Sequence, residues 1–159
     1  MMNSEFVSQK MMFPGRVDDL RGEALTLFNT LRNAGRMARV LSFLSPTRLH
    51  TLSEDLRGRT VKGTRQVGVR TLELSRLSGS ESRVDDFDAA FRPLREQSRD
   101  RFVSIAVARL QGREMPAIQV IELDGRYYVR DGHHRVAVAR ALGEAFIEAG
   151  VTVLTAGEN

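Results

Sequence analysis

The feature that most constrains the fold is a β-hairpin pattern that runs directly into a helix pattern. Residues 117–123 and 126–130 are rich in Val, Ile, Leu and Tyr, and they flank Asp124-Gly125. This dipeptide favours a type I′ turn because both of its residues accept positive φ. After Gly132 the apolar residues recur at helical spacing. The sequence therefore predicts a hairpin whose second strand turns straight into a helix.

The rest of the chain carries weaker patterns of the same two kinds. Apolar residues at helical spacing, with glycine near the expected ends, predict helices elsewhere, and alternating Val, Leu and Thr predict strands. The predicted helices cover residues 16–35 (closed by Gly35), 36–44, 45–58 (opened by Ser45 and Pro46) and 98–111, the further strands cover 66–77 and a short 150–154, and residues 78–83 are predicted as a loop.

This order predicts an α+β fold, in which a small mixed sheet is packed against helices and is preceded by an N-terminal helical segment. We expect residues 1–60 to form that helical segment with a basic linker, and residues 61–159 to form the sheet-containing domain. The hydrophobic content of 42% is sufficient for a core.

The composition excludes several kinds of chemistry and indicates a cellular compartment. The chain has no cysteine, so disulfides, thiolate catalysis and cysteine zinc sites are excluded. The apolar runs are too short to span a bilayer, and the N-terminus lacks a signal-peptide pattern. We therefore expect a cytoplasmic protein that does not enter membranes.

Positive charge is concentrated in the first half of the chain. Residues 1–70 hold 12 Lys/Arg and 6 Asp/Glu, a net charge of +6, whereas residues 71–159 hold 12 and 14, a net charge of −2. From Arg57 to Arg70 the chain carries five cations and no acidic residue. Such a stretch can contact nucleic acid phosphates. It can also be a solvated, flexible linker, and this is the interpretation that the composition favours. The cations of this run are Arg57, Arg59, Lys62, Arg65 and Arg70, of which the first four are the candidate nucleic-acid-binding residues.

The start of the last predicted helix is the best candidate for a binding site. Gly132 allows a tight turn, and the unpaired amides that follow it at a helix N-terminus favour anions, phosphate above all. Arg135 carries a guanidinium fork that suits phosphate oxygens, and His133 and His134 add donors. Asp131 could hold Mg²⁺ or accept a proton from an attacking hydroxyl.

Two other interpretations of the same residues stay open. A zinc site at the histidine pair is disfavoured because adjacent side chains diverge by roughly 100° on a helix. The third histidine, His50, lies in a separate segment. The stretch could also be a solvated turn, although a turn needs only the glycine. Phosphate binding is the favoured interpretation.

At these residues the sequence resembles the ParB/sulfiredoxin superfamily. Members combine a strand, a turn with Gly-x-[His/Arg]-Arg and an alanine-rich helix, as in Gly132-His133-His134-Arg135 followed by VAVARALG. The resemblance covers roughly residues 65–155. Sulfiredoxins carry a cysteine where this chain has His133, so sulfiredoxin chemistry is excluded. The form Asp-Gly-His-His-Arg is most similar to the free serine kinases, and SGSESRVDDFDAAF is similar to short ParB-like proteins of bacteria.

The resemblance implies roles for individual residues. Asp131 would be a catalytic residue, and Gly132, His133, His134 and Arg135 would bind the phosphates of a nucleoside tri- or diphosphate with Mg²⁺. The serine kinases also use a glutamate near the first strand. Between Glu73 and Glu81 we assign this second catalytic position to Glu81, because it is predicted in a loop.

Three functions follow from these observations. The first is a nucleotide-binding protein that hydrolyses a nucleoside triphosphate or transfers a phosphoryl group, an NTPase or phosphotransferase. The second is a nucleotide-regulated DNA-binding or nuclease-like protein that uses the basic N-terminal half. The third is a non-catalytic adaptor whose N-terminal helices bind a partner protein. A homodimer is compatible with each of them.

Overall fold

The computed structural model describes residues 17–41 and 48–158, and it confirms the predicted α+β class. One mixed sheet of six strands has the order β1-β3-β5-β4-β6-β2. Its strands are β1 (His50–Thr51), β2 (Arg59–Glu73), β3 (Leu77–Ser80), β4 (Ile118–Leu123), β5 (Arg126–Asp131) and β6 (Phe146–Glu158), and the helices are α2 (Val17–Val40), α3 (Leu52–Asp55), α4 (Arg99–Leu110) and α5 (His133–Ala141).

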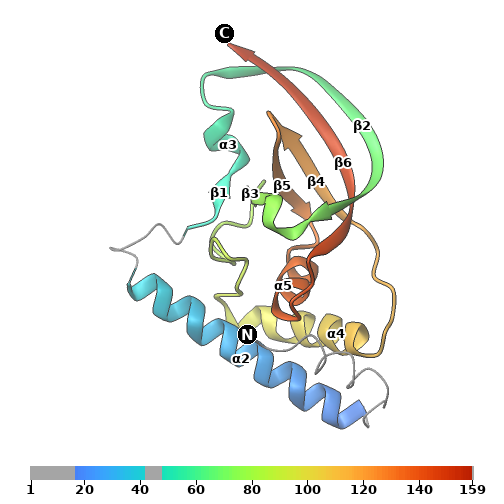
Figure 1. Cartoon of the computed structure of the whole chain (residues 1–159). Helices are drawn as coiled ribbons and strands as arrows, with labels where there is room; N and C mark the ends of the chain where they lie inside the picture. Colours follow the sequence, from blue (N-terminus) through green and yellow to red (C-terminus); the bar gives the residue numbers. More distant parts are fainter. Residues whose placement is uncertain (1–16, 42–47, 159) are drawn as a thin grey trace.

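The three longer helices are stacked on one side of the sheet. Helix α5 contacts β4 and α4, and α4 in turn contacts α2, which is the outermost helix in Figure 1. The ring of Phe28 on α2 lies 5.6 Å from that of Phe102 on α4, measured between centroids. Helix α2 is therefore joined to the rest of the protein through the hydrophobic core, as the buried Ala24 and Phe28 show.

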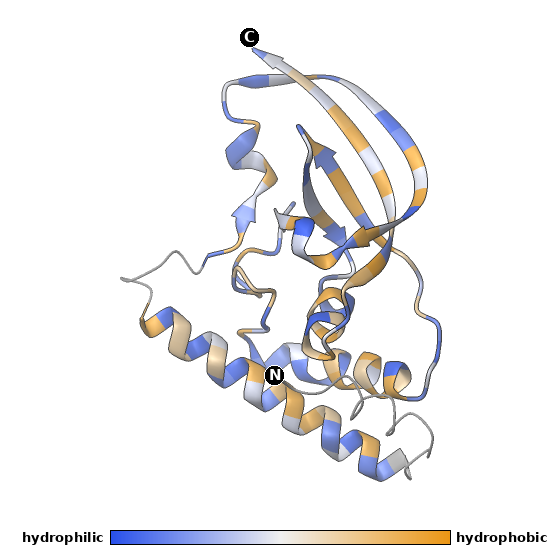
Figure 2. Ribbon diagram, in the orientation of Figure 1, coloured by the Kyte–Doolittle hydropathy of each residue, from blue (hydrophilic) through white to orange (hydrophobic). Residues whose placement is uncertain are grey.

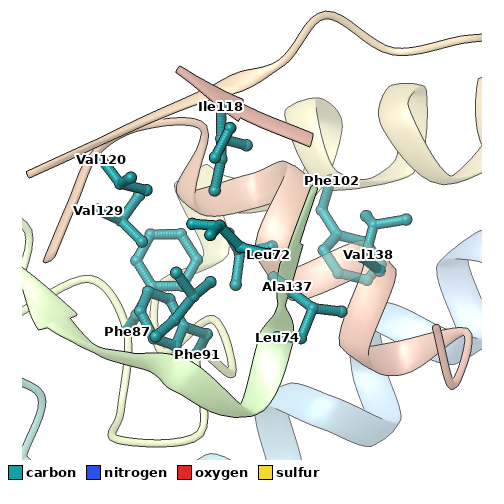
Figure 3. Close-up of a cluster of buried hydrophobic side chains, with 14 of the residues drawn as sticks. Leu72, Leu74, Phe87, Phe91, Phe102, Ile118, Val120, Val129, Ala137 and Val138 are labelled. Atoms are coloured by element: carbon teal, nitrogen blue, oxygen red, sulfur yellow. The ribbon is translucent and has the colours of Figure 1, made fainter. Parts of the chain in front are cut away.

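The main core fills the space between the sheet and α4 and α5 (Figure 3). It includes Phe87 and Phe91, which come from the long connection between β3 and α4 and are fully buried. A second, smaller cluster lies apart from it and joins α3 to β4 and β5, through Leu52, Ile121, Leu123 and Tyr128. Burial on both sides explains why apolar residues of β4 and β5 follow one another, as in Val120-Ile121 and Tyr127-Tyr128-Val129, instead of alternating with polar ones.

The hairpin and the helix that follows it are confirmed. Strands β4 and β5 pair antiparallel, and the two turn residues have the positive φ values that a type I′ turn requires, 51° for Asp124 and 79° for Gly125. Helix α5 begins at His133, directly after Gly132. Helix α4 also lies where the sequence predicts it.

The prediction of two separate helices, over residues 16–35 and 36–44, is wrong, because α2 continues through Gly35 to Val40. Residues 42–44 of the second predicted helix lie outside the described residues. Gly35 is buried, and a Cβ at this position would lie 3.1 Å from the Leu94 side chain. The glycine permits close packing of the helix on the connection that contains Leu94. The sequence pattern predicts a helix end at Gly35 because glycine is common at helix ends.

The predicted helix over residues 45–58 is also wrong in most of its length. Ser45 and Pro46 lie outside the described residues, and His50–Thr51 is strand β1, which pairs in parallel with β3. Only the four residues of α3 are helical. Thr51 caps this turn: its hydroxyl accepts from the amide of Glu54, and the Glu54 carboxylate accepts from the amide of Thr51.

The basic stretch is a strand, which corrects both the predicted linker and the predicted start of the strand at residue 66. Strand β2 begins at Arg59 and pairs along its whole length with β6. Two bulges, at Lys62 and Val67, shift the register and interrupt the two-residue alternation that identifies a strand in sequence. Figure 2 shows the hydrophilic and hydrophobic residues as bands along β2.

Two further boundaries differ from the prediction. The last strand, β6, has 13 residues rather than five, because β2 supplies a partner along its full length. The predicted loop over residues 78–83 contains most of β3, which is held between β1 and β5. Strands from both sides of residue 60 belong to the same sheet, and residue 60 itself lies within β2.

No helix in residues 17–41 or 48–158 is long and apolar enough to cross a bilayer.

Candidate functional site

The predicted phosphate-binding turn lies where two parallel strands end at the same edge of the sheet. Strand β3 runs parallel to β5, so Ser80 and Glu81 lie beside the residues that connect β5 to α5. The amide of Glu81 donates to the carbonyl of Val129 at 3.0 Å, which extends this pairing past the end of β3. In open α/β sheets the carboxyl ends of parallel strands are the usual position of ligand sites.

Gly132 makes the turn between β5 and α5 with a φ of 98°. A Cβ at this position would lie 2.5 Å from Cγ2 of Ile118. Both the backbone conformation and the close contact therefore require glycine here. Helix α5 has no side-chain cap at Gly132. Its first amides thus keep their capacity to bind an anion, and the helix dipole adds partial positive charge at the same point.

His133 is part of the core rather than of a surface. Its side chain is 3% exposed, its ring stacks on Phe87 with the centroids 5.6 Å apart, and its Nε2 lies 2.7 Å from the Ser80 hydroxyl. Burial, followed by the positive charge of Arg83, lowers the pKa of His133 to about 4. At neutral pH the imidazole is uncharged, and it ties α5 to β3.

His134 has a nitrogen with no partner. Its Nε2 is buried and forms no hydrogen bond within the described residues, although the ring packs edge-on against Phe87 with the centroids 5.1 Å apart. Burial, then the charges of Arg101 and Arg83, lowers the pKa of His134 to about 4. These two arginines, from α4 and from the loop after β3, therefore lie close to the start of α5.

Arg135 does not present an open guanidinium. Its Nη1 donates to the carbonyls of Pro116 and Ala117 at 2.5 and 2.9 Å, and its Nη2 pairs with Asp131 at 2.7 Å. The Arg135 side chain is only 13% exposed, whereas that of Asp131 is 65% exposed. Arg135 thus fastens the connection before β4 to the start of α5, and it leaves the Asp131 carboxylate at the surface.

Glu81 and Asp131 are brought to the same edge of the sheet, as the parallel pairing of β3 and β5 requires. The Glu81 carboxylate forms a two-point ion pair with Arg130, with distances of 2.9 and 3.1 Å. Each of the two predicted catalytic carboxylates therefore has an arginine partner. Within the described ranges no group of three or more His, Asp or Glu side chains is arranged to hold a metal ion.

The predicted nucleic-acid-binding residues lie elsewhere, at the edge strand β2 and the turn before it. Two strands, β4 and β6, separate β2 from β5. Arg59 is engaged with protein groups: it pairs with Asp124 at 2.6 Å and donates to the carbonyl of Ala156 at 3.0 Å. Arg57, Lys62 and Arg65 point to no acidic partner in the described part of the chain.

Sequence reasoning missed Ser80, Arg83 and Arg101, which the fold brings to the start of α5. Ser80 and Arg83 stand in the SGSESR segment, whose Ser/Gly content is typical of a loop. Arg101 lies in the first turn of α4, and no local pattern connects this helix to Gly132. Ser80 and Arg83 could have been found by predicting a strand at residues 77–80 that pairs in parallel with β5. The carboxyl end of such a strand lies beside the start of α5.

Comparison of the chain with protein-family models, with curated proteins and with solved structures gives no match.

Proposed function

We propose that this protein binds the phosphate groups of a nucleoside tri- or diphosphate at the start of α5, in a corner formed by Gly132, His134, Arg83 and Arg101. The observation that carries the proposal is the buried, unpartnered Nε2 of His134, next to an uncapped helix N-terminus and close to two arginines. A buried nitrogen without a hydrogen bond is costly in a protein that has no ligand for it.

The charges of this corner suit a phosphate. The amides of the first turn of α5 and the helix dipole attract an anion. Arg101 is exposed and makes no ion pair with a described residue, and Arg83 has only a long contact of 3.4 Å with Asp86. The neutral His134 can donate its Nε2 hydrogen to a phosphate oxygen without adding charge.

The resemblance to free serine kinases extends the proposal to phosphoryl transfer or hydrolysis. Asp131 is largely exposed, so its carboxylate can accept a proton from an attacking hydroxyl or water. Asp86, which lies 3.4 Å from Arg83 and also acts on His134, is the other carboxylate of this corner. With only these two carboxylates, Mg²⁺ would be held mainly by phosphate oxygens and water, which is its usual coordination in such enzymes. Glu81 and Arg130 would position the residues around Asp131 through their ion pair.

The test measures nucleotide binding by isothermal titration calorimetry, with ATP, ADP and CTP in the presence of Mg²⁺. We expect Arg101→Gln and His134→Phe each to weaken binding by about tenfold, the effect of losing one charge-assisted or buried hydrogen bond. Arg113→Gln is the matched control, because Arg113 is exposed and lies in the connection before β4.

Turnover of the same nucleotides is measured separately. Asp131→Asn should abolish turnover while it leaves binding within about threefold, because the variant keeps the shape of the side chain but not its basicity. Binding that is unchanged in both Arg101→Gln and His134→Phe would contradict the proposed site.

A further inference from the structure

Strands β2 and β6 form a long curved ribbon (the β2–β6 ribbon, Arg59–Glu73 with Phe146–Glu158), which extends away from α2, α4 and α5 in Figure 1. Arg65 is paired in register with Val153, and Arg70 with Ala149. Directly opposed residues of an antiparallel pair point to the same face. Because Val153 and Ala149 pack in or against the main core, both arginines lie on that face of the ribbon.

Lys62 belongs to the same face. It is the extra residue of the first bulge, and its Nζ and Cε would lie 2.7 Å from a Cβ on Gly157. Gly157 shares its face with Ala149, since alternate residues of an unbulged strand point the same way. The three exposed cations therefore form one row, the Lys62–Arg65–Arg70 row.

The acidic residues of the ribbon lie on the opposite face. The pairs Glu73–Phe146, Thr71–Glu148 and Arg59–Glu158 are each an odd number of steps along β6 from Ala149, so their side chains point away from the cation row. The ribbon thus has one face with positive charge and no acid.

The members of the row are also unpaired. None of the three makes an ion pair within residues 17–41 and 48–158, whereas arginines on the other strands do, such as Arg126 with Asp55 and Arg130 with Glu81. Several exposed arginines of this protein thus have a carboxylate partner close by. The row lacks them, and this leaves three cations available to a polyanion.

We propose that the Lys62–Arg65–Arg70 row binds the phosphate backbone of double-stranded DNA. Eight strand steps separate Lys62 from Arg70, a span of about 26 Å. This span matches roughly eight base pairs of duplex, which carry a phosphate about every 3.4 Å on each strand. The inference is independent of the nucleotide site, because β4 and β6 separate β2 from β5.

An anionic membrane fits this surface less well. Membrane-surface segments place apolar side chains beside their cations, but the exposed Val61 and Val69 are paired with Ala156 and Gly150. Both of these lie on the opposite face of β6 from Ala149. The cations and the exposed valines therefore cannot meet one membrane surface together.

The test is the fluorescence anisotropy of a labelled mixed-sequence duplex titrated with the full chain at several salt concentrations. The ribbon variant is Lys62→Gln/Arg65→Gln/Arg70→Gln. The matched control is Arg21→Gln/Arg36→Gln/Arg113→Gln, three exposed residues on α2 and in the connection before β4. Both variants lower the net charge by 3, from +4.

We expect the ribbon variant to lose at least tenfold in affinity at low salt, and its log–log salt slope to fall by up to about 2.7, since each phosphate contact contributes about 0.9. The control should change affinity by less than about threefold. Arg65→Lys/Arg70→Lys, which keeps the charges, should restore most of the binding, and far-ultraviolet circular dichroism checks that each variant is folded.

Three outcomes would overturn the inference: no binding to the duplex at low salt, an equal loss in the ribbon and control variants, or ribbon-dependent binding to phosphatidylserine vesicles but not to DNA. Nucleotide affinity should be unchanged in the ribbon variant. Failure of the full chain to bind the duplex while it still binds nucleotide would therefore reject this inference alone, whereas loss of nucleotide binding with intact duplex binding would reject only the nucleotide site.

Discussion

The Nε2 atom of His133 and the hydroxyl of Ser80 lie 2.7 Å apart, across the junction between α5 and the end of β3. The same hydroxyl oxygen accepts from the amides of Ser82 and Arg83, at 3.2 and 2.9 Å. One buried serine therefore fixes both the first residue of α5 and the loop that carries Arg83. The position of Arg83 beside the helix start depends on this contact.

Ser80→Ala should lower the free energy of unfolding by about 1–3 kcal/mol, because it leaves the buried Nε2 of His133 and two loop amides without their partner. Urea unfolding followed by circular dichroism measures the change. Ser78→Ala is the matched control: Ser78 is exposed, its hydroxyl has only a 3.4 Å contact with the Arg76 carbonyl, and the expected change is below about 0.5 kcal/mol. Equal effects of the two substitutions would contradict the role of Ser80.

Stability should decrease as the pH is lowered from about 6.5 towards 4. The pKa values of His133 and His134 are about 4 in the folded protein, below the value of about 6.5 in an unfolded chain. The unfolded state therefore binds more protons in this range, and stability is highest above it. At pH 5 the expected loss is about 2 kcal/mol for the buried His133, and less for the partly exposed His134.

Nuclear magnetic resonance of the imidazole protons, recorded alongside urea unfolding at each pH, assigns this effect. Midpoints for His133 and His134 below pH 5 are expected. Midpoints near the ordinary histidine value, with no loss of stability between about pH 7 and pH 5, would show that the two rings are not held in a buried, uncharged state.

Gly132→Ala should destabilise the protein by about 2–5 kcal/mol, because the new methyl group meets Ile118 and the backbone stays at positive φ. Gly143→Ala separates the two causes. Gly143 also has positive φ, 73°, but a Cβ there meets nothing within 4 Å, so a cost of about 1–2 kcal/mol is expected. Thermal and urea unfolding of both variants give the comparison, and a smaller cost at Gly132 than at Gly143 would refute the steric argument.

Tyr128→Phe should cost about 1.5–3 kcal/mol, because the fully buried Tyr128 donates its hydroxyl hydrogen to the carboxylate of Asp55. Burial and this carboxylate raise the pKa of Tyr128 to about 12, so absorbance titration should show one tyrosine that stays protonated well above pH 10. Tyr127→Phe is the control, since the Tyr127 hydroxyl has no hydrogen bond to a described residue. It should change stability by less than about 0.5 kcal/mol, and a similar cost in both variants would contradict the contact.

The parts of the fold that sequence could predict are those fixed by neighbouring residues. Asp124-Gly125 specifies its own turn through two positive φ angles, and Gly132 specifies the start of α5 in the same way. Residues 59–65 of strand β2 could not be placed from sequence, because the bulges at Lys62 and Val67 break the alternation, and the pairing partner β6 lies more than 70 residues away. The end of α2 was misplaced because Gly35 serves a packing contact with Leu94 rather than a helix end.

The candidate site, like the fold, could be predicted from the sequence only in part. Gly132, His134 and Asp131 were found because they are contiguous. The contacts around them could not be predicted, because the orientation of each side chain depends on groups that are distant in the sequence. The hydroxyl of Ser80 contacts His133 in the core. The carbonyls of Pro116 and Ala117 accept hydrogen bonds from Arg135. A local motif thus predicts the corner of the protein but not Arg83 and Arg101, whose charges act on His134.

Strand β2 has fifteen residues and forms an edge of the sheet, with β6 as its only neighbour among the strands of residues 17–41 and 48–158. A flat edge of this length exposes a row of backbone donors and acceptors that can recruit further strands and begin aggregation. The two bulges interrupt this row, and the positive side chains of β2 would repel the same strand of another copy. The irregularity that conceals the first part of β2 in the sequence thus also protects the protein against uncontrolled self-association.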